Sequence, residues 1–423
     1  MRSTLPAEVD VAIVGGGIIG ISTALALARK GIRVAVFEKG TVAGEQSSRN
    51  WGWIRTVGRD PRELPLSAIA NDMWTDIQAR VNVGYRRTGL AYLAETDKEM
   101  ARHQAWLNSA KDTGTEGSLL GRDELARLIP TSNRPWIGAL YSAGDGVAEP
   151  SLATAAIARL AAEAGAMVFE RCAVRGLESS AGRTSAVVTE LGVVKCASVV
   201  LAGGAWSRLF CGNNAVDFPQ LKVHASVLRT GPLETGLEMA INGSDFTCRK
   251  RADGGYTVSQ LGASIADVTP DSIRLCRQFL PAWMAERKYL KLRVGRRFVE
   301  EMKIPRHFPL DAPTPFEACR TLDPPPTMKM VDGALGKLKH AFPAFKNATV
   351  AQAWAGFIDV TPDAVPVISE VGKIPGFFLA AGFSGHGFGI GPAAGALMAD
   401  LVTGDTPGVD PKAFRLDRFN SCG

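Results

Sequence analysis

The first forty residues place apolar side chains in the pattern of a strand, a helix and a second strand. In VDVAIVGGGIIGISTALALARKGIRVAVFEKG, apolar runs predict strands over residues 9–14 and 33–37 and a helix over residues 18–30. Gly31 supplies a stop after the helix. This order is typical of a parallel βαβ unit.

The turn between the first strand and the helix is rich in glycine. Gly15, Gly17 and Gly20 form G-x-G-x-x-G, which gives a tight turn, close approach of the backbone to a pyrophosphate and close packing of helix on strand. Free N–H groups at the start of the helix, beginning at Ile18, favour such an anion. Glu38 follows the second strand, where an acid accepts hydrogen bonds from a ribose. The unit therefore predicts a dinucleotide site for FAD or NAD.

A second glycine-rich loop, GFSGHGFGIG, occupies residues 382–391. The pattern predicts a strand over residues 377–381 before it, and Pro392 predicts the first turn of a helix after it. A reduced flavin ring carries negative charge that a helix N-terminus stabilises, so this loop favours FAD over NAD. A glycine turn that only packs helices is the alternative.

The rest of the chain contains further Rossmann-type segments and, between them, segments with the pattern of strands in another sheet. Residues 151–179 predict an amphipathic helix and a strand, and residues 193–207 predict a strand that ends in glycines. Strand patterns also occur at 85–94, 222–230 and 246–260, a helical pattern at 270–290 despite Pro281, and a rigid connector at 321–330.

A chain of 423 residues exceeds one usual hydrophobic core, which favours two domains. We expect a Rossmann-type α/β FAD-binding domain interleaved with an α+β substrate domain whose antiparallel sheet caps the flavin. The expected FAD-binding pieces are residues 1–80, 147–213 and 350–423, and the expected substrate-domain pieces are residues 81–146 and 214–349.

Composition and charge narrow the class of protein. The net charge of +6 is spread along the chain rather than gathered in a block, which argues against nucleic acid as a partner. The seven cysteines are scattered without metal-ligand spacing, so we expect no metal site and reduced thiols in a cytoplasmic protein. No signal peptide or membrane span is visible, while peripheral contact at the inner face of a membrane stays open.

Several stretches together carry a family resemblance: the opening βαβ unit, QSSRNWGWIR (46–55), the segments 144–169 and 197–207, TPDAVPVI (361–368) and the second glycine loop. In this combination the chain resembles the D-amino acid oxidase family of FAD enzymes, in its glycine oxidase, sarcosine oxidase and D-amino acid dehydrogenase branch. The resemblance runs over nearly the whole length, and residues 215–345 match only in outline.

The resemblance implies FAD bound without a covalent bond, because Gly356 stands where flavinylated relatives have the attaching cysteine. It also implies a set of cofactor contacts beyond Gly15, Gly17, Ile18, Gly20 and Glu38. These are Lys39, Ser47, Ser48, Arg49, Asn50, Trp51, Gly52, Trp53, Val174, Ala202, Gly203, Trp206, Gly356, Gly382, Phe383, Gly385, His386, Gly387, Phe388 and Gly389.

The reaction that the resemblance implies is oxidation of a C–N bond. A hydride passes from the carbon that bears the amine to flavin N5, and water hydrolyses the imine. We expect an amino acid substrate, most simply a D-amino acid, with an opine or another N-substituted amino acid or amine as the alternative and a non-catalytic dinucleotide-binding protein as a remoter one. The electron acceptor is oxygen or a quinone or other carrier, and a partner subunit stays open.

Substrate residues depart from the family pattern. Relatives place a carboxylate-binding arginine in W-x-G-x-R-P, whereas this chain has Ile358 and then Asp359. Arg55, at the end of RNWGWIR, is the leading substitute because guanidinium binds a carboxylate through two hydrogen bonds. Asp359 either meets a cation of the substrate or caps the turn into TPDAVP. Arg249 lies on a predicted strand of the cap, where side chains alternate between cavity and outside.

Two further side chains are candidates for the site. His386 lies in the second glycine loop and either donates to flavin or substrate or packs beneath the loop. Tyr256 either reaches the cavity with its hydroxyl or fills the interior. The basic run at residues 287–297 fits a solvated face better than a docking site for an acidic electron-transfer partner.

Overall fold

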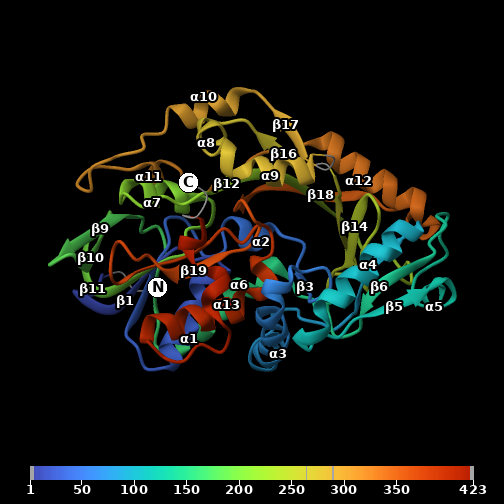
Figure 1. The fold of residues 1–423 in the computed structure, drawn as a ribbon, viewed down its shortest axis with the longest axis horizontal. Helices are drawn as coiled ribbons and strands as arrows, with labels where there is room; N and C mark the ends of the chain where they lie inside the picture. Colours follow the sequence, from blue (N-terminus) through green and yellow to red (C-terminus); the bar gives the residue numbers. More distant parts are fainter. Residues whose placement is uncertain (1–3, 263, 288–289, 420–423) are drawn as a thin grey trace.

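The structure is a computed structural model that describes residues 4–262, 264–287 and 290–419. Two large sheets organise it, with helices packed on both (Figure 1). The first sheet holds β1 at its centre, parallel to its neighbours, and ends in an antiparallel edge strand. Its strands, in spatial order, are β8 (Met167–Phe169), β2 (Val34–Phe37), β1 (Glu8–Val14), β11 (Gly192–Leu201), β20 (Phe377–Ala381) and β19 (Val367–Glu370). Off this path, β10 (Arg183–Thr189) pairs with β11, and β9 (Val174–Ser180) pairs with β10.

One face of this sheet is covered by helices from distant parts of the chain, which share an apolar cluster with the strands. Their apolar faces explain the burial, because β1 and β2 are apolar on both sides and need cover on both. The helices are α1 (Ile18–Arg29), α3 (Leu64–Arg80), α6 (Pro150–Glu163) and α13 (Gly387–Thr403). The other face packs against α7 (Ser207–Asn213) and α11 (Pro315–Ala318).

The second sheet is mostly antiparallel and forms the other half of the molecule (Figure 1). Its strands, in order, are β5 (Ser118–Gly121), β6 (Gly138–Ser142), β4 (Leu90–Ala94), β13 (Ala240–Asn242), β14 (Phe246–Lys250), β15 (Tyr256–Gln260), β12 (Leu221–Thr230), β16 (Ser264–Asp267) and β17 (Leu290–Arg293); β18 (Val350–Val360) also pairs with β12. Helix α12 (Met328–Ala341) buries its apolar face against β14 and β15.

Shorter elements complete the described chain. Helices α8 (Pro270–Arg274), α9 (Cys276–Glu286) and α10 (Arg296–Met302) lie along the upper edge in Figure 1. A two-stranded ribbon joins β3 (Trp53–Ile54) to β7 (Gly146–Val147). The remaining helices are α2 (Gln46–Arg49), α4 (Asp97–Ala110) and α5 (Arg122–Ala126).

The structure differs from expectation at two boundaries. Residues 350–360, expected in the FAD-binding piece, form β18, which hydrogen-bonds along the full length of β12 in the second sheet, so the chain returns to the first sheet only at β19. Helix α13 begins at Gly387, five residues before the predicted first turn, and holds Pro392 inside it. The glycines therefore belong to the helix itself and bring its N-terminus into the loop.

Candidate active site

The glycine turn after β1 forms one wall of a narrow cavity. Gly15 has a φ of +110°, and a Cβ on Gly20 would lie 2.0 Å from the Gly15 oxygen, so both positions require glycine. Gly17 is the N-cap of α1, and Ile18 N donates to Ser47 Oγ at 2.8 Å. Gly15 and Gly17 both line the cavity without a side chain, which fits close approach of a pyrophosphate to the start of α1.

Glu38 stands at the end of β2 beside this turn. Its carboxylate accepts from the N–H groups of Gly16 and Gly40, each at 2.7 Å. Burial raises the pKa of Glu38, while these hydrogen bonds and Lys39 oppose the shift. A carboxylate held at this point fits a ribose, since it can accept hydrogen bonds from the hydroxyl groups of the sugar.

Many residues predicted for the cofactor meet in this cavity. Those that line it are Gly15, Gly17, Ile18, Glu38, Lys39, Ser47, Asn50, Val174, Ala202, Gly203, Trp206, Phe383, Gly385, Gly387 and Phe388. The sequence analysis did not predict several other lining residues, among them Gly44, Gln46, Phe316 and Arg320. Gln46 adjoins a predicted segment and could have been included, whereas residues 316 and 320 come from the part of the chain where the family pattern is weakest.

The other predicted cofactor residues lie behind the cavity wall. Arg49 donates to the oxygens of Gly44 and Leu322, and its own oxygen accepts from Trp354 Nε1 at 2.9 Å. A Cβ on Gly389 would lie 2.8 Å from the Trp53 oxygen, so this glycine lets α13 pack on β3. The residues in this outer group are Gly20, Ser48, Arg49, Trp51, Gly52, Trp53, Gly356, Gly382, His386 and Gly389.

Asp359 anchors the second glycine loop. Its Oδ2 accepts from Gly382 N at 2.7 Å and from Gln220 Nε2 at 3.1 Å, and the Asp359 oxygen accepts from Ser384 N at 2.8 Å. The side chain is fully buried, and burial raises its pKa to about 6, although the hydrogen bond from Gly382 opposes the shift. Among the described residues none of these hydrogen bonds reaches the turn into TPDAVP, so Asp359 holds the second glycine loop instead of capping that turn. Asp359 also lines the cofactor cavity.

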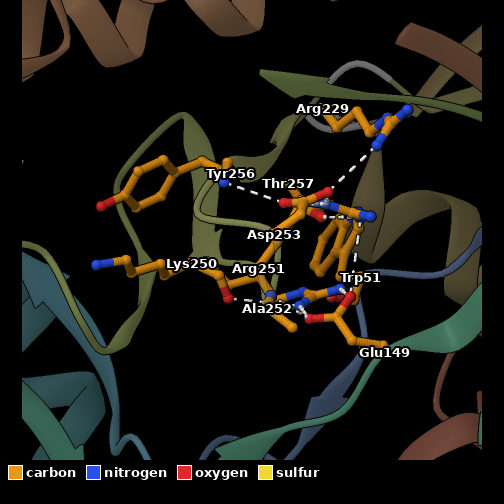
Figure 2. A network of polar contacts seen from close by, with 12 residues as sticks. Trp51, Glu149, Arg229, Lys250, Arg251, Ala252, Asp253, Tyr256 and Thr257 are labelled. Carbon is orange, nitrogen blue, oxygen red and sulfur yellow. Dashed lines mark hydrogen bonds and ion pairs between the residues drawn. The ribbon is translucent and has the colours of Figure 1, made fainter. Parts of the chain in front are cut away.

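Arg249 and Tyr256 were expected at the substrate. They line neither the cofactor cavity nor a larger cavity between the sheets and α9. Arg249 is 1% exposed, pairs through both terminal nitrogens with Glu149 at 2.8 and 3.1 Å, and donates from Nε to the Trp51 oxygen. Figure 2 shows Glu149 next to Ala252 and Trp51, while Tyr256 points away from this network. The Tyr256 hydroxyl bonds Thr235 Oγ1 at 2.6 Å within the apolar core. We therefore assign Arg249 to positioning of the segment at Trp51 and Tyr256 to packing.

A second, much larger cavity of about 1360 Å³ opens between the sheets and α9. Trp206 lines both cavities, and Ser384 lines the large cavity beside Gly385, which lines the small one. The lining of the large cavity is mainly apolar. It includes Trp106, Leu140, Leu209, Val223, Phe279, Leu280, Trp283, Ile304, Ile358 and Val360.

Ile358, which stands where the resemblance places the family's arginine, lines this cavity. Arg55 lines neither cavity, but its guanidinium lies 5.7 Å from the ring centroid of Tyr92, which lines the large one. Arg55 Nη1 donates to the Val57 oxygen at 2.6 Å. Among the described residues no carboxylate lies within 4.0 Å of Arg55, whereas Arg59 and Arg249 each pair with a glutamate.

His386 caps the start of α13, between the two glycines that line the cofactor cavity. Its Nδ1 lies 3.2 Å from Oε2 of Glu63, a buried carboxylate that no sequence motif indicated. Arg59 binds the same carboxylate at 3.2 Å and donates to the His386 oxygen at 3.2 Å. The three residues form one closed contact group beneath the loop.

In residues 4–262, 264–287 and 290–419, no group of three or more His, Cys, Asp or Glu side chains is placed to hold a metal ion. Nor does any helix there combine the length and the apolar character that crossing a bilayer requires.

Residues 10–401 match the sequence pattern of the family described as FAD dependent oxidoreductase. The chain belongs to this family. The predicted D-amino acid oxidase resemblance is thereby confirmed, as are FAD as cofactor, the class of oxidoreductase and a fold of Rossmann-type and antiparallel-sheet parts. The glycine turn, Glu38 and the start of α1 line the cofactor cavity and fit this cofactor.

Two curated relatives and one solved structure illustrate the likeness. The 4-methylaminobutanoate oxidase (formaldehyde-forming) of Paenarthrobacter nicotinovorans is 24% identical over 98% of this chain, which spans 46% of that protein's length. Glycine oxidase of Geobacillus kaustophilus is 27% identical, with 97% of each chain covered. The structure of L-amino acid deaminase from Proteus myxofaciens, in complex with anthranilate, is 33% identical with a TM-score of 0.95 over 99% of this chain and 95% of that one.

Proposed function

We propose that this protein oxidises the C–N bond of an L-α-amino acid with a large apolar side chain, releasing a 2-oxo acid and ammonia. FAD, when bound, accepts the hydride from the carbon that bears the amine. The protein's residues bind the carboxylate, accommodate the side chain and exclude water. The observation that carries this proposal is the large apolar cavity that meets the cofactor cavity at Trp206.

The size of this cavity supports a bulky substrate. At about 1360 Å³ it exceeds the range of most small-molecule sites, and glycine or sarcosine would leave nearly all of it unfilled. Each additional apolar group buried by the substrate contributes favourable binding free energy, about 0.8 kcal/mol per CH₂. The likeness to an L-amino acid deaminase supports the L configuration, while the earlier expectation of a D-amino acid has no contact in its favour.

Arg55 is our candidate for the substrate carboxylate. Its guanidinium is half-buried, held by the Val57 oxygen and packed on Tyr92, and it lacks a carboxylate partner among the described residues. A bidentate contact to substrate would supply that partner. We expect Arg55→Lys to raise KM at least tenfold with a smaller change in kcat, because a point charge cannot replace the guanidinium fork. Arg62→Lys, in the exposed pair with Asp60, is the matched control and should leave KM unchanged.

A substrate panel tests the reaction. Purified protein with FAD is mixed anaerobically with L- and D-phenylalanine, L-leucine, glycine, sarcosine and an opine, and flavin bleaching and 2-oxo acid are measured. Reduction by L-phenylalanine and L-leucine, with little by glycine, supports the proposal. Preference for a D-amino acid or for glycine would contradict it.

Oxidation of an N-substituted amino acid is the second candidate. It is favoured by Ile358 at the place of the usual carboxylate arginine and by relatives named for 4-methylaminobutanoate and sarcosine. Preferential flavin bleaching by the opine or by sarcosine in the same panel would select it.

We further propose that FAD is held without a covalent bond. Gly356 lies on β18 with a Cβ position 3.5 Å from Arg49, and of the cysteines the structure describes only Cys276 and Cys319 are more than slightly accessible. Acid precipitation should leave the yellow colour in the supernatant; colour that stays with the polypeptide would refute this.

We also propose that the protein contacts a membrane surface and passes its electrons to a quinone. Helices α8 to α10 and β17 expose apolar side chains among basic ones, a composition that suits an anionic lipid surface. The exposed apolar residues are Ile273, Leu280, Met284, Leu292, Val294, Val299 and Met302. Co-sedimentation with phosphatidylglycerol vesicles, lost in 0.5 M salt, supports this contact, and equal recovery without vesicles contradicts it.

A further inference from the structure

The connection between α10 and α12, residues 303–327, contains only one short helix, α11. A connection of this length with so little regular structure is uncommon in a compact protein and usually has a function. Its central part, residues 315–323, is called the strap below. Phe316 and Arg320 of the strap line the cofactor cavity, so a segment from the middle of the chain reaches the site of the dinucleotide.

Side chains of the loop after β2 tie the strap to one wall of the cavity. Lys39 Nζ donates to the backbone oxygens of Cys319 and Arg320 at 2.7 and 3.0 Å. Glu45 Oε1 accepts from Leu322 N at 2.9 Å. Lys39 and Glu45 both line the cavity and pair with each other at 2.7 Å. The loop that forms this wall is therefore bonded to the strap along four consecutive residues, 319–322.

Two ion pairs tie the strap to the opposite wall. Arg320 pairs through both terminal nitrogens with Glu190, which lies between β10 and β11, and the Nη2–Oε2 distance is 2.6 Å. Glu317 accepts from Arg175 Nε of β9 at 2.6 Å. Val174, next to Arg175, lines the cavity. The strap thus bridges the two sides of the cofactor cavity.

Phe316 fills the space between the strap and this second wall. It is 4% exposed, and its ring centroid lies 5.9 Å from that of Trp206 and 6.0 Å from that of Phe210. All three rings line the cofactor cavity. Phe316 therefore places apolar surface of the strap directly against the cavity.

The attachment of the strap involves side chains at every contact with the walls. Among the described residues, no hydrogen bond from main chain to main chain joins residues 315–323 to either wall, and no strand pairing holds them. A segment held in this way can open locally while both sheets stay intact.

We propose that the strap closes the cofactor cavity over bound FAD, that FAD enters and leaves when the strap lifts, and that Lys39 and Glu190 are positioning residues that hold it from opposite walls. This rests on the proposed non-covalent binding of FAD. Since Phe316 and Arg320 are part of the lining, contacts with the cofactor favour the closed strap. The large cavity, which meets the cofactor cavity at Trp206, is the other route by which FAD could pass.

The first test measures how fast FAD binds to the apoprotein at saturating FAD and how fast it is released. Glu190 lines neither cavity, so Glu190→Gln weakens the hold on Arg320 without removing a lining residue. We expect both rates to rise together, about two- to fivefold, with little change in the dissociation constant. Glu178→Gln, which removes an equal charge from an exposed position on β9, is the matched control and should change neither rate. Unchanged rates in Glu190→Gln, or faster release alone, would overturn the strap as the route of FAD.

Gly40 offers a second change on the other wall. The atoms nearest to a Cβ at this position belong to Arg320 and Thr321 of the strap, and the closest, the Arg320 oxygen, would lie 2.3 Å away. Gly40→Ala should therefore push the strap from its closed position and speed FAD release about tenfold. Gly372→Ala, whose Cβ position has nothing within 4 Å, should release FAD at the wild-type rate. Equal release from both variants would contradict the proposal.

The third test uses wild-type protein and trypsin, for which Arg320 is a site within the strap. Cleavage of a folded protein follows the population of the open segment, so FAD should slow cleavage after Arg320. Cleavage after Arg296, whose side chain is 91% exposed on α10, is the internal control and should not depend on FAD. Equal protection of both sites would mean that FAD stabilises the whole fold and not the strap. Yellow colour that stays with the polypeptide in acid fails the proposal of non-covalent FAD, whereas releasable FAD with unchanged rates and cleavage fails the strap.

Discussion

At the scale of single residues, Asp359 shows how burial makes the stability contribution of a loop-anchoring carboxyl group depend on pH. Its carboxylate binds Gly382 and Gln220, yet its surroundings raise its pKa to about 6, above the ordinary value of 3.8. A carboxyl group with a raised folded-state pKa favours the folded state while protonated. That contribution is present below about pH 4 and is lost as the pH rises through about 6.

Asp359→Asn removes this titration. We expect the stability of the variant relative to wild type to increase by about 3 kcal/mol between pH 4 and pH 7, from a shift of about two pKa units. Urea unfolding of both apoproteins at several pH values measures the difference. A stability difference that is constant across this range would show that Asp359 does not titrate there.

Residue roles were predictable from the sequence where the reason is backbone geometry. Gly15, Gly17 and Gly20 follow from the spacing of the turn, because only glycine permits such close approach. Arg249 was misplaced because strand alternation gives two faces without saying which face meets Glu149. Glu63 was invisible for a related reason: its partner His386 lies in a different part of the sequence, and a lone glutamate at a helix start has no distinguishing pattern.

At the scale of elements, the contact between α1 and α13 depends on missing side chains. A Cβ on Gly395 would lie 2.5 Å from the backbone of Ser22, so the two helices touch main chain to main chain. Packing at this distance cannot relax by moving a flexible side chain.

We therefore expect Gly395→Ala to destabilise the protein by about 1–3 kcal/mol through overpacking. Gly336→Ala in α12 is the matched control, since it also lies in a helix but has nothing within 4 Å of its Cβ position, and it should stabilise by about 0.5–1 kcal/mol. Thermal unfolding of both variants measures the signs. Equal effects of the two substitutions would mean that helix propensity, and not the contact between α1 and α13, determines the change in stability.

The pattern of apolar residues predicted where helices and strands lie more accurately than it predicted where they begin and end. The strand at 377–381 and the helix after Gly17 stand where the apolar runs place them. The predicted start of α13 lies too far along the sequence, because proline is most common in the first turn of a helix. In the structure Pro392 lies inside α13, after a first turn that is rich in glycine.

At the scale of the whole molecule, Arg249 and Glu149 join three parts of the chain: β14 of the second sheet, the start of α6 and the segment at Trp51 (Figure 2). Because both charges are buried, removing one leaves the other without its partner.

We expect Arg249→Met to destabilise the fold by about 3–5 kcal/mol, and the double variant Arg249→Met with Glu149→Leu to recover part of that loss. Urea unfolding of the two single variants and the double variant gives the coupling energy. If the stability losses of the two single variants add up in the double variant, the coupling energy is zero and Arg249 and Glu149 do not depend on each other.

The interleaved path of the chain also sets an order of assembly during synthesis. Strands β1 and β2 emerge first, but β1 meets its neighbour β11 only after residue 192, and β11 meets β20 only after residue 377. The loop that closes the cofactor cavity, residues 383–388, follows still later. Pairings this distant in sequence form slowly and leave strand edges unpaired meanwhile. The cofactor cavity is therefore incomplete until the start of α13 has been synthesised, and until then the part of β11 that pairs with β20 stays open to chaperones.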